Sequence, residues 1–278
     1  MENFNGTLVE SSTNSLSNNR GFLYGDAVFE TFKIVDNRIL FLEDHYFRLM
    51  SSMRILRMEI PMHFTMEFLE QQILELIQFN NIQNSARVRM TVYRNGNGYY
   101  LPDSNEINYL IQSSKLGSKE YFLNDNSYEV DLFKDFYITK QLLSTIKSTN
   151  KAVQIVGSIF ANENGLQNCL VLNDSKNVIE ALNGNIFMFK DAKLVTPPLN
   201  EGCLNGVMRK QVISIAKALN VDVVEEPLSP FDLQKADELF ITNVISGIQP
   251  ITRYRKKDFK NTFSTTLIQQ LNEQFILI

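Results

Sequence analysis

The residues of this chain that could do chemistry are a lysine, a glutamate and a glycine at a helix start, in that order. Lys147 follows three apolar residues, Leu142, Leu143 and Ile146. Because desolvation disfavours an ammonium group, an amine in such surroundings loses its proton more readily and can form a Schiff base. The alternative is a surface lysine whose carbon stem lies along apolar neighbours.

Two features further along the chain supply what such an amine would need around a cofactor. Glu180 is a carboxylate in a β-rich stretch, and Gly206 precedes a predicted helix over 207–219. The first backbone N–H groups of a helix have no partner within it, so they suit a phosphate. An amine, a carboxylate and a phosphate cup are the three groups that a protein must offer pyridoxal phosphate (PLP).

Six segments of the chain resemble the class IV aminotransferase family and occur in that family's order. They are residues 25–31, 45–49, 146–150, 178–187, 204–209 and 236–243. The family comprises fold-type IV PLP enzymes, among them branched-chain aminotransferases, D-amino-acid aminotransferases and 4-amino-4-deoxychorismate lyases. The resemblance implies PLP as cofactor, a homodimer and an α/β fold of the α+β type. That fold has a small α/β sandwich domain and a larger β-rich domain with flanking helices.

The resemblance also implies roles for three side chains. Lys147 matches the lysine that forms the Schiff base, with Lys151 and Lys140 as competing amines nearby. Glu180 matches the glutamate that bonds the pyridine nitrogen, where a carboxylate keeps the ring protonated. Arg48 matches the arginine that grips the phosphate, a task that suits the fixed fork of a guanidinium group.

Each of these residues also has a simpler explanation. Glu180 could be a solvated residue at a strand end, and Arg48 could pair with Glu43 or Asp44 on its own helix. The other residues that the resemblance assigns fall into two groups. The phosphate cup would include Val207, Met208, Asn243 and Val244, and the substrate would meet Tyr24, Phe29 and Arg89. For the substrate group the alternative is packing or sheet-surface charge.

The elements that must position these residues begin with a small domain over residues 1–112. Asn5-Gly6 predicts a tight turn near the start, and Thr65 is a plausible N-cap for a second helix. Residues 86–93 alternate strictly between apolar and polar side chains, which predicts a strand with one polar face able to meet water or an anion. The expected elements are a strand in 1–10, a hairpin over 28–42, helices over 43–58 and from 65, and strands over 86–93 and 107–111.

A polar stretch over 113–126 predicts the connection to a larger domain over 127–278, which carries Lys147. Turn residues between short β-runs predict an antiparallel meander over 169–189. The apolar tail 275–278 is expected to dock on the core or on a partner. The other expected elements are strands over 128–132, 221–225, 238–242 and 247–252, and helices over 152–162, 207–219 and 230–235.

Composition excludes several classes of function. With 44% hydrophobic and 21% charged residues and a net charge of −4, the chain resembles an ordinary globular protein without an overall field for nucleic acid. Its one basic run, residues 253–260, is better explained as a solvated loop. The start has no secretory signal, and no apolar run reaches the length of about 18 residues that spans a membrane. We therefore expect a cytoplasmic protein that acts on a small-molecule amine.

Scarce histidines and cysteines narrow the chemistry further. Cys169 and Cys203 stand alone, so neither a zinc site nor a disulfide framework is expected. The two histidines, His45 and His63, lie in no catalytic or metal-binding motif. His45 follows two acidic residues at a predicted helix start, which is typical of a capping region.

The family divides over its reaction. After proton removal, reprotonation at the cofactor gives transamination, whereas loss of an enolpyruvyl group gives pyruvate and 4-aminobenzoate. Residues 204–209 resemble the lyases' Asn-Gly-x-Met-Arg, 25–31 their Gly-Asp-Gly-x-Phe, and Thr242-Asn243 replaces the aminotransferases' Gly-Thr. Two segments depart from the pattern, because 98–102 lacks a second arginine after Arg94 and Asn183-Gly184 is unusual for either subfamily.

We therefore expect a PLP-dependent 4-amino-4-deoxychorismate lyase of folate biosynthesis. An aminotransferase for branched-chain or D-amino acids is the alternative, and the two differ in whether a keto acid is needed for turnover. A PLP-carrying protein with low activity is a third hypothesis. The combination of Lys147, Glu180 and Arg48 argues against it, because binding alone does not require an electron-sink carboxylate.

Overall fold

The structure, a computed structural model, describes residues 1–9, 19–124 and 126–276 of the chain. These residues form two compact units. Unit 1 comprises Met1–Lys119 together with Ile146–Asn150, and unit 2 comprises Glu120–Thr145 together with Lys151–Ile278. The division falls within the expected connection 113–126, but the segment of Lys147 is grouped with unit 1. The reason is that it pairs with a strand of unit 1, as described below.

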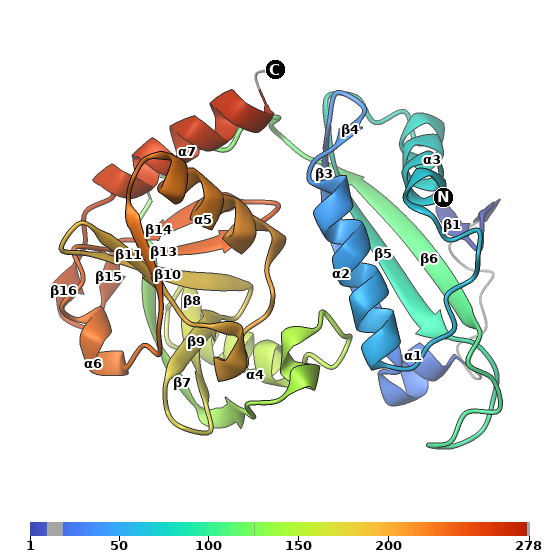
Figure 1. Ribbon diagram of the computed structural model, residues 1–278, viewed down its shortest axis with the longest axis horizontal. Coiled ribbons are helices and arrows are strands. Elements are labelled where there is room, and N and C mark those ends of the chain that lie inside the picture. Colours follow the sequence, from blue (N-terminus) through green and yellow to red (C-terminus); the bar gives the residue numbers. More distant parts are fainter. Residues whose placement is uncertain (10–18, 125, 277–278) are drawn as a thin grey trace. The chain divides into compact units, whose positions relative to one another are not determined.

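Unit 1 is a six-stranded antiparallel sheet in the order β2-β1-β6-β5-β3-β4, with α2 and α3 covering one face (Figure 1). Its elements are β1 (Glu2–Phe4), β2 (Thr7–Val9), α1 (Arg20–Tyr24), β3 (Ala27–Val35), β4 (Arg38–Ile39), α2 (Leu42–Ile55), α3 (Met66–Phe79), β5 (Ser85–Arg94) and β6 (Ile107–Lys115).

The alternation predicted for residues 86–93 is confirmed in β5. Ala86, Val88, Met90 and Val92 are buried in the core beneath the two helices, so the residues between them lie on the other face of the sheet. The predicted N-cap is confirmed as well, since the Thr65 hydroxyl accepts a hydrogen bond from the backbone N–H of Phe68. The Asn5-Gly6 turn is also present, with both residues at positive φ as a tight hairpin requires.

Unit 2 is built on a ten-stranded sheet whose strands β8, β9 and β10 form the predicted antiparallel meander, which β11 continues. Its strands are β7 (Glu129–Ile138), β8 (Asn168–Asn173), β9 (Val178–Ala181), β10 (Gly184–Lys190), β11 (Lys193–Thr196), β12 (Asp222–Glu225), β13 (Glu238–Asn243), β14 (Gly247–Ile251), β15 (Arg253–Tyr254) and β16 (Lys257–Asp258). Its helical segments are η1 (Leu142–Thr145), α4 (Ala152–Glu163), η2 (Leu199–Glu201), α5 (Val207–Ala218), α6 (Pro230–Leu233) and α7 (Thr262–Phe275).

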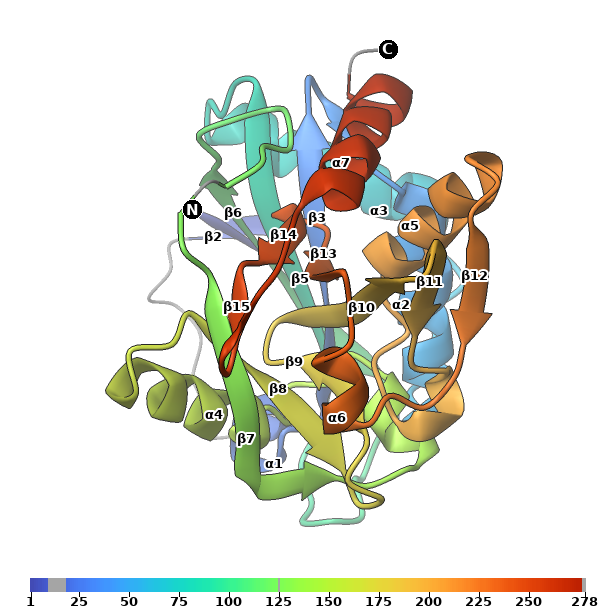
Figure 2. The same cartoon turned by 90° about the vertical axis from the view of Figure 1, so that its left-hand side faces the viewer.

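The helices of unit 2 pack on different parts of this sheet (Figure 2). Helices α5 and α7 contact each other and the strands β12, β13 and β14, while α4 lies against β7 and β8. The sequence did not predict α7, and it placed only an apolar tail at 275–278. Phe275 ends α7 and Ile276 is buried, whereas residues 277 and 278 lie outside the described part of the chain.

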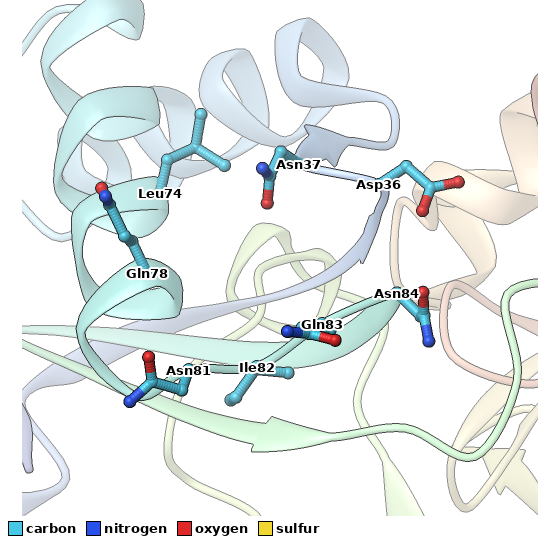
Figure 3. A pocket seen from close by; sticks show the side chains of 8 residues that line it. All are labelled: Asp36, Asn37, Leu74, Gln78, Asn81, Ile82, Gln83 and Asn84. Atoms are coloured by element: carbon cyan, nitrogen blue, oxygen red, sulfur yellow. The ribbon is translucent and has the colours of Figure 1, made fainter.

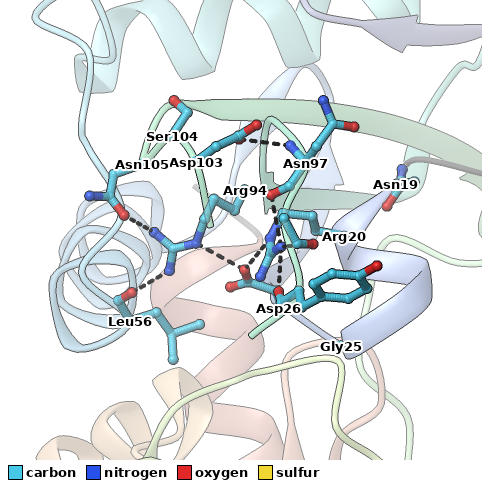
Figure 4. A network of polar contacts seen from close by, with 12 residues as sticks. Asn19, Arg20, Gly25, Asp26, Leu56, Arg94, Asn97, Asp103, Ser104 and Asn105 are labelled. Atoms are coloured by element: carbon cyan, nitrogen blue, oxygen red, sulfur yellow. Dashed lines mark hydrogen bonds and ion pairs between the residues drawn. The ribbon is translucent and has the colours of Figure 1, made fainter. Parts of the chain in front are cut away.

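One buried ion cluster joins α1 to the loop before β6 in unit 1 (Figure 4). The Nε atoms of Arg20 and Arg94 donate to the same carboxylate oxygen of Asp26, at 3.0 and 2.9 Å. Arg20 also donates to the backbone carbonyls of Asn97, Gly98 and Tyr99. Loop 97–99 is therefore held by a guanidinium group that Asp26 keeps in place.

Replacing Asp26 tests how much unit 1 depends on this cluster. In Asp26→Asn, two guanidinium groups that are 3% and 7% exposed lose their carboxylate. Because an uncompensated buried charge is costly, the free energy of unfolding should fall by about 3 kcal/mol or more in urea titrations. Asp36→Asn is the matched control, since Asp36 pairs with Lys119 where both side chains are more than 40% exposed. It should cost at most about 1 kcal/mol, and equal losses would contradict the interpretation.

Candidate functional site

The segment of Lys147 runs antiparallel beside the start of β3 in unit 1. The backbone N–H of Phe29 donates to the carbonyl of Lys147 at 2.8 Å, and that of Thr149 donates to Ala27 at 3.0 Å. Gly25 has a φ of +64°, and a Cβ there would lie 2.3 Å from the side-chain oxygen of Asn150. The Asn150 side chain packs against Gly25 so closely that a larger residue at position 25 would clash with it. This contact explains why residues 25–31 begin with glycine and residues 146–150 end with asparagine.

The expected source of apolar surroundings for Lys147 was partly wrong. Leu142 and Leu143 are 63% and 51% exposed, and only Ile146 is buried. The apolar neighbour is instead Phe29, whose ring centroid lies 4.7 Å from the Lys147 Nζ. The Arg89 guanidinium carbon lies 3.9 Å from the same centroid. The structure therefore brings two predicted cations, Arg89 and Lys147, against the ring of a third predicted residue, Phe29.

Arg89 belongs to a cationic face of the sheet, opposite α2 and α3. Lys33 lies across from Arg87 in the β3–β5 pairing, and Thr31 lies across from Arg89. Burial lowers the pKa of Lys33 to about 8 and, together with the charge of Arg87, lowers that of Arg89. Because neighbouring like charges destabilise a sheet, this face suits an anion such as a substrate carboxylate.

Arg48 pairs with a residue of β3, whereas the simpler explanation of its position had named Glu43 or Asp44 on its own helix. Its Nε and Nη2 donate to the two carboxylate oxygens of Glu30, at 2.7 and 2.5 Å. His45 also lies against Glu30, with Nδ1 2.8 Å from Oε2. The predicted capping role of His45 was therefore wrong, since its side chain reaches β3 from the first turns of α2.

The charges of this cluster follow from burial and from its internal contacts. Burial alone would raise the pKa of Glu30, but the attraction and hydrogen bonds of Arg48 and His45 overcome it and lower the pKa to about 2. Burial lowers the pKa of His45 despite the contact with Glu30. Its Nε2 atom is buried and has no hydrogen-bond partner in the described part of the chain, so a proton there would have no acceptor among these residues. Glu30 is thus ionised and His45 neutral at pH 7.

In unit 2 the backbone of Leu204 is held by hydrogen bonds at both its N–H and its carbonyl. Its N–H donates to Glu180 Oε2 at 2.9 Å, and its carbonyl accepts from Asn185 Nδ2 at 2.8 Å. Glu180 and Asn185 are directly opposite each other in the β9–β10 pairing. The sheet register therefore fixes the predicted carboxylate relative to the loop that leads into α5.

The start of α5 has the features that a phosphate cup needs. The N-cap Gly206 makes no side-chain cap, and the first turn contains no acidic residue. A Cβ at Gly206 would lie 1.9 Å from Asn185 Oδ1, so only glycine allows this close approach. Backbone N–H groups and the positive end of the helix dipole favour a dianion here. Val207 and Met208, both predicted, form the first turn.

A buried hydroxyl lies in the same row of the sheet. Thr242 is directly opposite Asn185 in the β10–β13 pairing and is 1% exposed. Its Oγ1 has no hydrogen-bond partner among the described residues, which is unusual for a buried polar group. The row Glu180, Asn185 and Thr242 thus includes one group that a ligand could satisfy. The sequence assigned no role to Asn185 or Thr242.

The two other predicted cup residues lie in the turn after β13. The Asn243 side chain accepts hydrogen bonds from the backbone N–H groups of Ile245 and Ser246, so its oxygen shapes the turn. The carbonyl of Val244 accepts a hydrogen bond from the Tyr121 hydroxyl at 2.8 Å. Any role of Asn243 and Val244 toward a phosphate depends on this fixed turn.

A buried glutamate anchors the loop before α5. Glu201 accepts hydrogen bonds from Lys140 Nζ, Asn173 and Asn177, and its backbone carbonyl also bonds Asn173. Lys140, which the sequence left as a competing amine, is therefore part of a structural ion pair. The anchor precedes Leu204 by three residues, so it limits the movement of the peptide that contacts Glu180.

Tyr24, a predicted substrate residue, contacts Arg20 and Tyr100. Its own ring is 38% exposed, 4.9 Å from the Arg20 guanidinium carbon and 6.1 Å from the ring of Tyr100. These contacts link α1 to the loop that Arg20 holds. They leave the predicted substrate role of Tyr24 untested.

A depression of about 700 Å³ in unit 1 contains none of the predicted residues (Figure 3). It is lined by Asp36, Asn37, Leu74, Gln78, Asn81, Ile82, Gln83 and Asn84. Four of these, Asp36, Asn37, Asn81 and Asn84, have positive φ and are explained by the turns they form. At about 3.3 Å per residue, the end of β3 that borders it is about 20 Å from Phe29.

Other kinds of site find no support in the described part of the chain. No group of three metal-ligating side chains occurs in residues 1–9, 19–124 and 126–276. Both cysteines are buried and free, and burial raises the pKa of Cys169 to about 11 and that of Cys203 to about 12. None of the helices in these ranges is long and apolar enough to cross a membrane.

Comparison with known proteins places this geometry in context. The sequence profile of the family described as Amino-transferase class IV matches residues 27–254. A protein of Methanocaldococcus jannaschii, provisionally described as a branched-chain-amino-acid aminotransferase, is 30% identical over 98% of this chain and 93% of its own length. The D-alanine aminotransferase of Listeria monocytogenes is 26% identical, with the same two coverages.

Two solved structures show the same fold. The branched-chain aminotransferase of Thermobaculum terrenum, in its PLP form, has a TM-score of 0.86 and 25% identity and covers 98% of this chain and 92% of its own. A provisionally described 4-amino-4-deoxychorismate lyase of Legionella pneumophila has a TM-score of 0.84 and 22% identity, over 95% of this chain and 96% of its own. The predicted fold class is confirmed.

The Thr242 hydroxyl, which has no partner within the described residues, gives a test of the cup in unit 2. Thr242→Val removes an unsatisfied buried group without changing the volume much, so the cofactor-free protein should become more stable by about 1 kcal/mol. Thr196→Val is the matched control, because the buried Thr196 hydroxyl donates to Ile186 at 2.8 Å. That variant should lose about 1 kcal/mol or more in urea titrations. Destabilisation of both variants would show that Thr242 has a partner.

The Glu30 cluster predicts loss of stability in acid. Burial lowers the pKa of His45, so below about pH 6.5 the unfolded chain binds a proton at His45 and the folded chain does not. Stability therefore falls as pH falls. The pKa of Glu30 is lower in the folded chain than in the unfolded chain. Protonation of Glu30 between pH 4.5 and about 2 therefore lowers the free energy of unfolding by a further amount on the order of 3 kcal/mol. Thermal unfolding at pH 7, 5.5, 4 and 2.5 measures the decline, and His45→Asn should flatten its upper part. A profile unchanged by His45→Asn would contradict the assignment.

Proposed function

Because the chain belongs to the class IV aminotransferase family, we propose that it is a PLP-dependent aminotransferase acting on branched-chain or D-amino acids. The observation that carries the proposal is the match over 98% of the chain to proteins described as aminotransferases. Three short motifs had indicated a lyase, but likeness over the whole chain is the stronger guide. We therefore prefer the alternative that the sequence left open.

The residues present fit the cofactor. In unit 2, a glycine-led helix start without acidic residues suits a phosphate, and a partnerless buried hydroxyl lies in the same row of the sheet as Glu180. In unit 1, Lys147 offers the amine and Arg48 a guanidinium group in a fixed orientation. Lys147 would hold the cofactor covalently, and Arg48, Val207 and Met208 would hold its phosphate.

The chain's own groups have distinct parts in the proposed reaction. When bound, PLP supplies an electron sink for the carbon that carries the substrate amine. Glu180 would keep the pyridine nitrogen protonated, and its bond from the Leu204 N–H fixes the carboxylate. Lys147 Nζ, once released, would move the proton at the amine-bearing carbon. Arg89, on the same ring as Lys147, would orient the substrate carboxylate.

A second candidate is the 4-amino-4-deoxychorismate lyase that residues 204–209 and 25–31 indicated. The likeness to the Legionella structure supports only the fold, which both activities share. Within residues 204–209, Arg209 donates to Glu225 and to the carbonyl of Pro197. Its part is therefore structural, which weakens the motif as a sign of lyase chemistry. The family resemblance also leads us to propose a homodimer.

The requirement for a keto acid separates the two activities. The PLP-loaded protein should transfer the amino group of a branched-chain L-amino acid or of D-alanine to 2-oxoglutarate, with no turnover when the acceptor is omitted. Release of 4-aminobenzoate and pyruvate in equal amounts from 4-amino-4-deoxychorismate alone would instead establish the lyase. Lys147→Ala should lower turnover by about 10³-fold or more. Lys151→Ala is its control, and a loss confined to that variant would move the amine's role to Lys151.

A further inference from the structure

The helix–sheet core of unit 1 contains a group of charges that the proposed function does not yet explain. Glu30 and His45 have side chains that are 1% and 0% exposed, and Arg48 is 9% exposed. The flanking strand residues Val28 and Phe32, on the same face of β3 as Glu30, are core residues. A carboxylate thus occupies a position where the pattern of the strand calls for an apolar side chain.

Stability alone is a poor reason for this arrangement. Taking two charges out of water costs several kcal/mol per ion, and apolar replacements of buried ion pairs are often neutral or stabilising. What a two-pronged pair does provide is geometry. Glu30 binds Nε and Nη2 of Arg48 at once, which fixes the plane of the guanidinium group and hence the direction of Nη1.

His45 fixes the carboxylate in turn without adding a charge. Its Nδ1 lies 2.8 Å from the Oε2 atom that also binds Arg48. The ring of His45 packs 4.7 Å from that of Phe32, and Nε2 has no partner among the described residues. A neutral imidazole that donates from Nδ1 is therefore the form that the surroundings accept. A protonated ring would present a second donor with no acceptor.

We propose that Glu30 and His45 are positioning residues for the cofactor's phosphate, because together they hold the Arg48 guanidinium group in the orientation that binds it. This inference rests on the proposed function, in which Arg48 contacts the phosphate. The chain of contacts runs from His45 through Glu30 to Arg48, and each member fixes the next. Glu30 belongs to the family-like segment 25–31, and His45 and Arg48 to 45–49, so the proposal explains three residues of two motifs.

The test compares PLP with pyridoxal, which lacks the phosphate. Both ligands are titrated into cofactor-free protein and their dissociation constants measured from the absorbance of the bound form. Substitution of a residue that acts through the phosphate changes the affinity for PLP only, whereas substitution of a residue that merely supports the fold changes the affinities for both ligands. In Glu30→Gln the affinity for PLP should fall about tenfold, as expected for loss of a charge-assisted contact. Its affinity for pyridoxal should stay unchanged.

His45 offers a pair of variants that keeps the test decisive if Glu30→Gln fails to fold. His45→Leu removes the donor and should lower the affinity for PLP about threefold relative to pyridoxal, since a neutral hydrogen bond contributes less than a charged one. His45→Asn keeps a donor near the position of Nδ1 and should restore the wild-type ratio. Glu43→Gln is the control, because Glu43 lies exposed on the same helix.

Each outcome bears on the proposal. An equal fall in both affinities would show that the cluster supports the fold alone and would overturn the inference. So would an unchanged ratio of affinities in Glu30→Gln and His45→Leu. If wild-type protein binds no PLP, the proposed function itself is rejected. If wild-type protein and both variants bind PLP equally well, only the positioning role is rejected. Bound PLP with a shifted phosphorus-31 resonance only in Glu30→Gln and His45→Leu would support the positioning role.

Discussion

The backbone of Leu204 is the point on which the proposed chemistry of unit 2 depends. Glu180 accepts its N–H and Asn185 binds its carbonyl, and these two residues are neighbours across adjacent strands. The pairing of β9 with β10 therefore sets both the carboxylate and the entry to α5. A one-residue slip in that pairing would turn both side chains to the other face. The pairing of these two strands therefore fixes the geometry of the candidate site in unit 2.

Unit 1 positions its candidate site residues in a different way, by burying charge. Glu30 with Arg48, Asp26 with two arginines, and the buried Lys33 all lie in or beside one six-stranded sheet. Such groups add little net stability, because desolvation offsets most of the attraction. They do define single orientations for side chains that would otherwise sample several rotamers. The proposed site, which would present cations to a small anion, needs that definition more than it needs a stronger core.

Local pattern made much of this architecture predictable. Period-two alternation identified β5 and its cationic face, and Thr65 marked the start of α3. Helix α7 was missed although its buried residues recur at helical spacing, because two of them are polar. Ser264 and Asn272 are buried only since Glu238 and the backbone of Tyr121, distant in sequence, satisfy them. The same limit hid the partner of Arg48, the roles of Asn185 and Thr242, and the exposure of Leu142 and Leu143.

The path of the chain through the two units has a consequence for dissecting the protein. Residues 146–150 are grouped with unit 1, while the stretches on either side of them are grouped with unit 2. No single cut of the polypeptide yields unit 1 complete. A fragment ending at residue 119 would leave the β3 edge beside Phe29 without the backbone partner that Lys147 supplies. Lys147, the proposed catalytic amine, would remain on the other fragment, so unit 1 and its lysine segment have to be kept in one polypeptide.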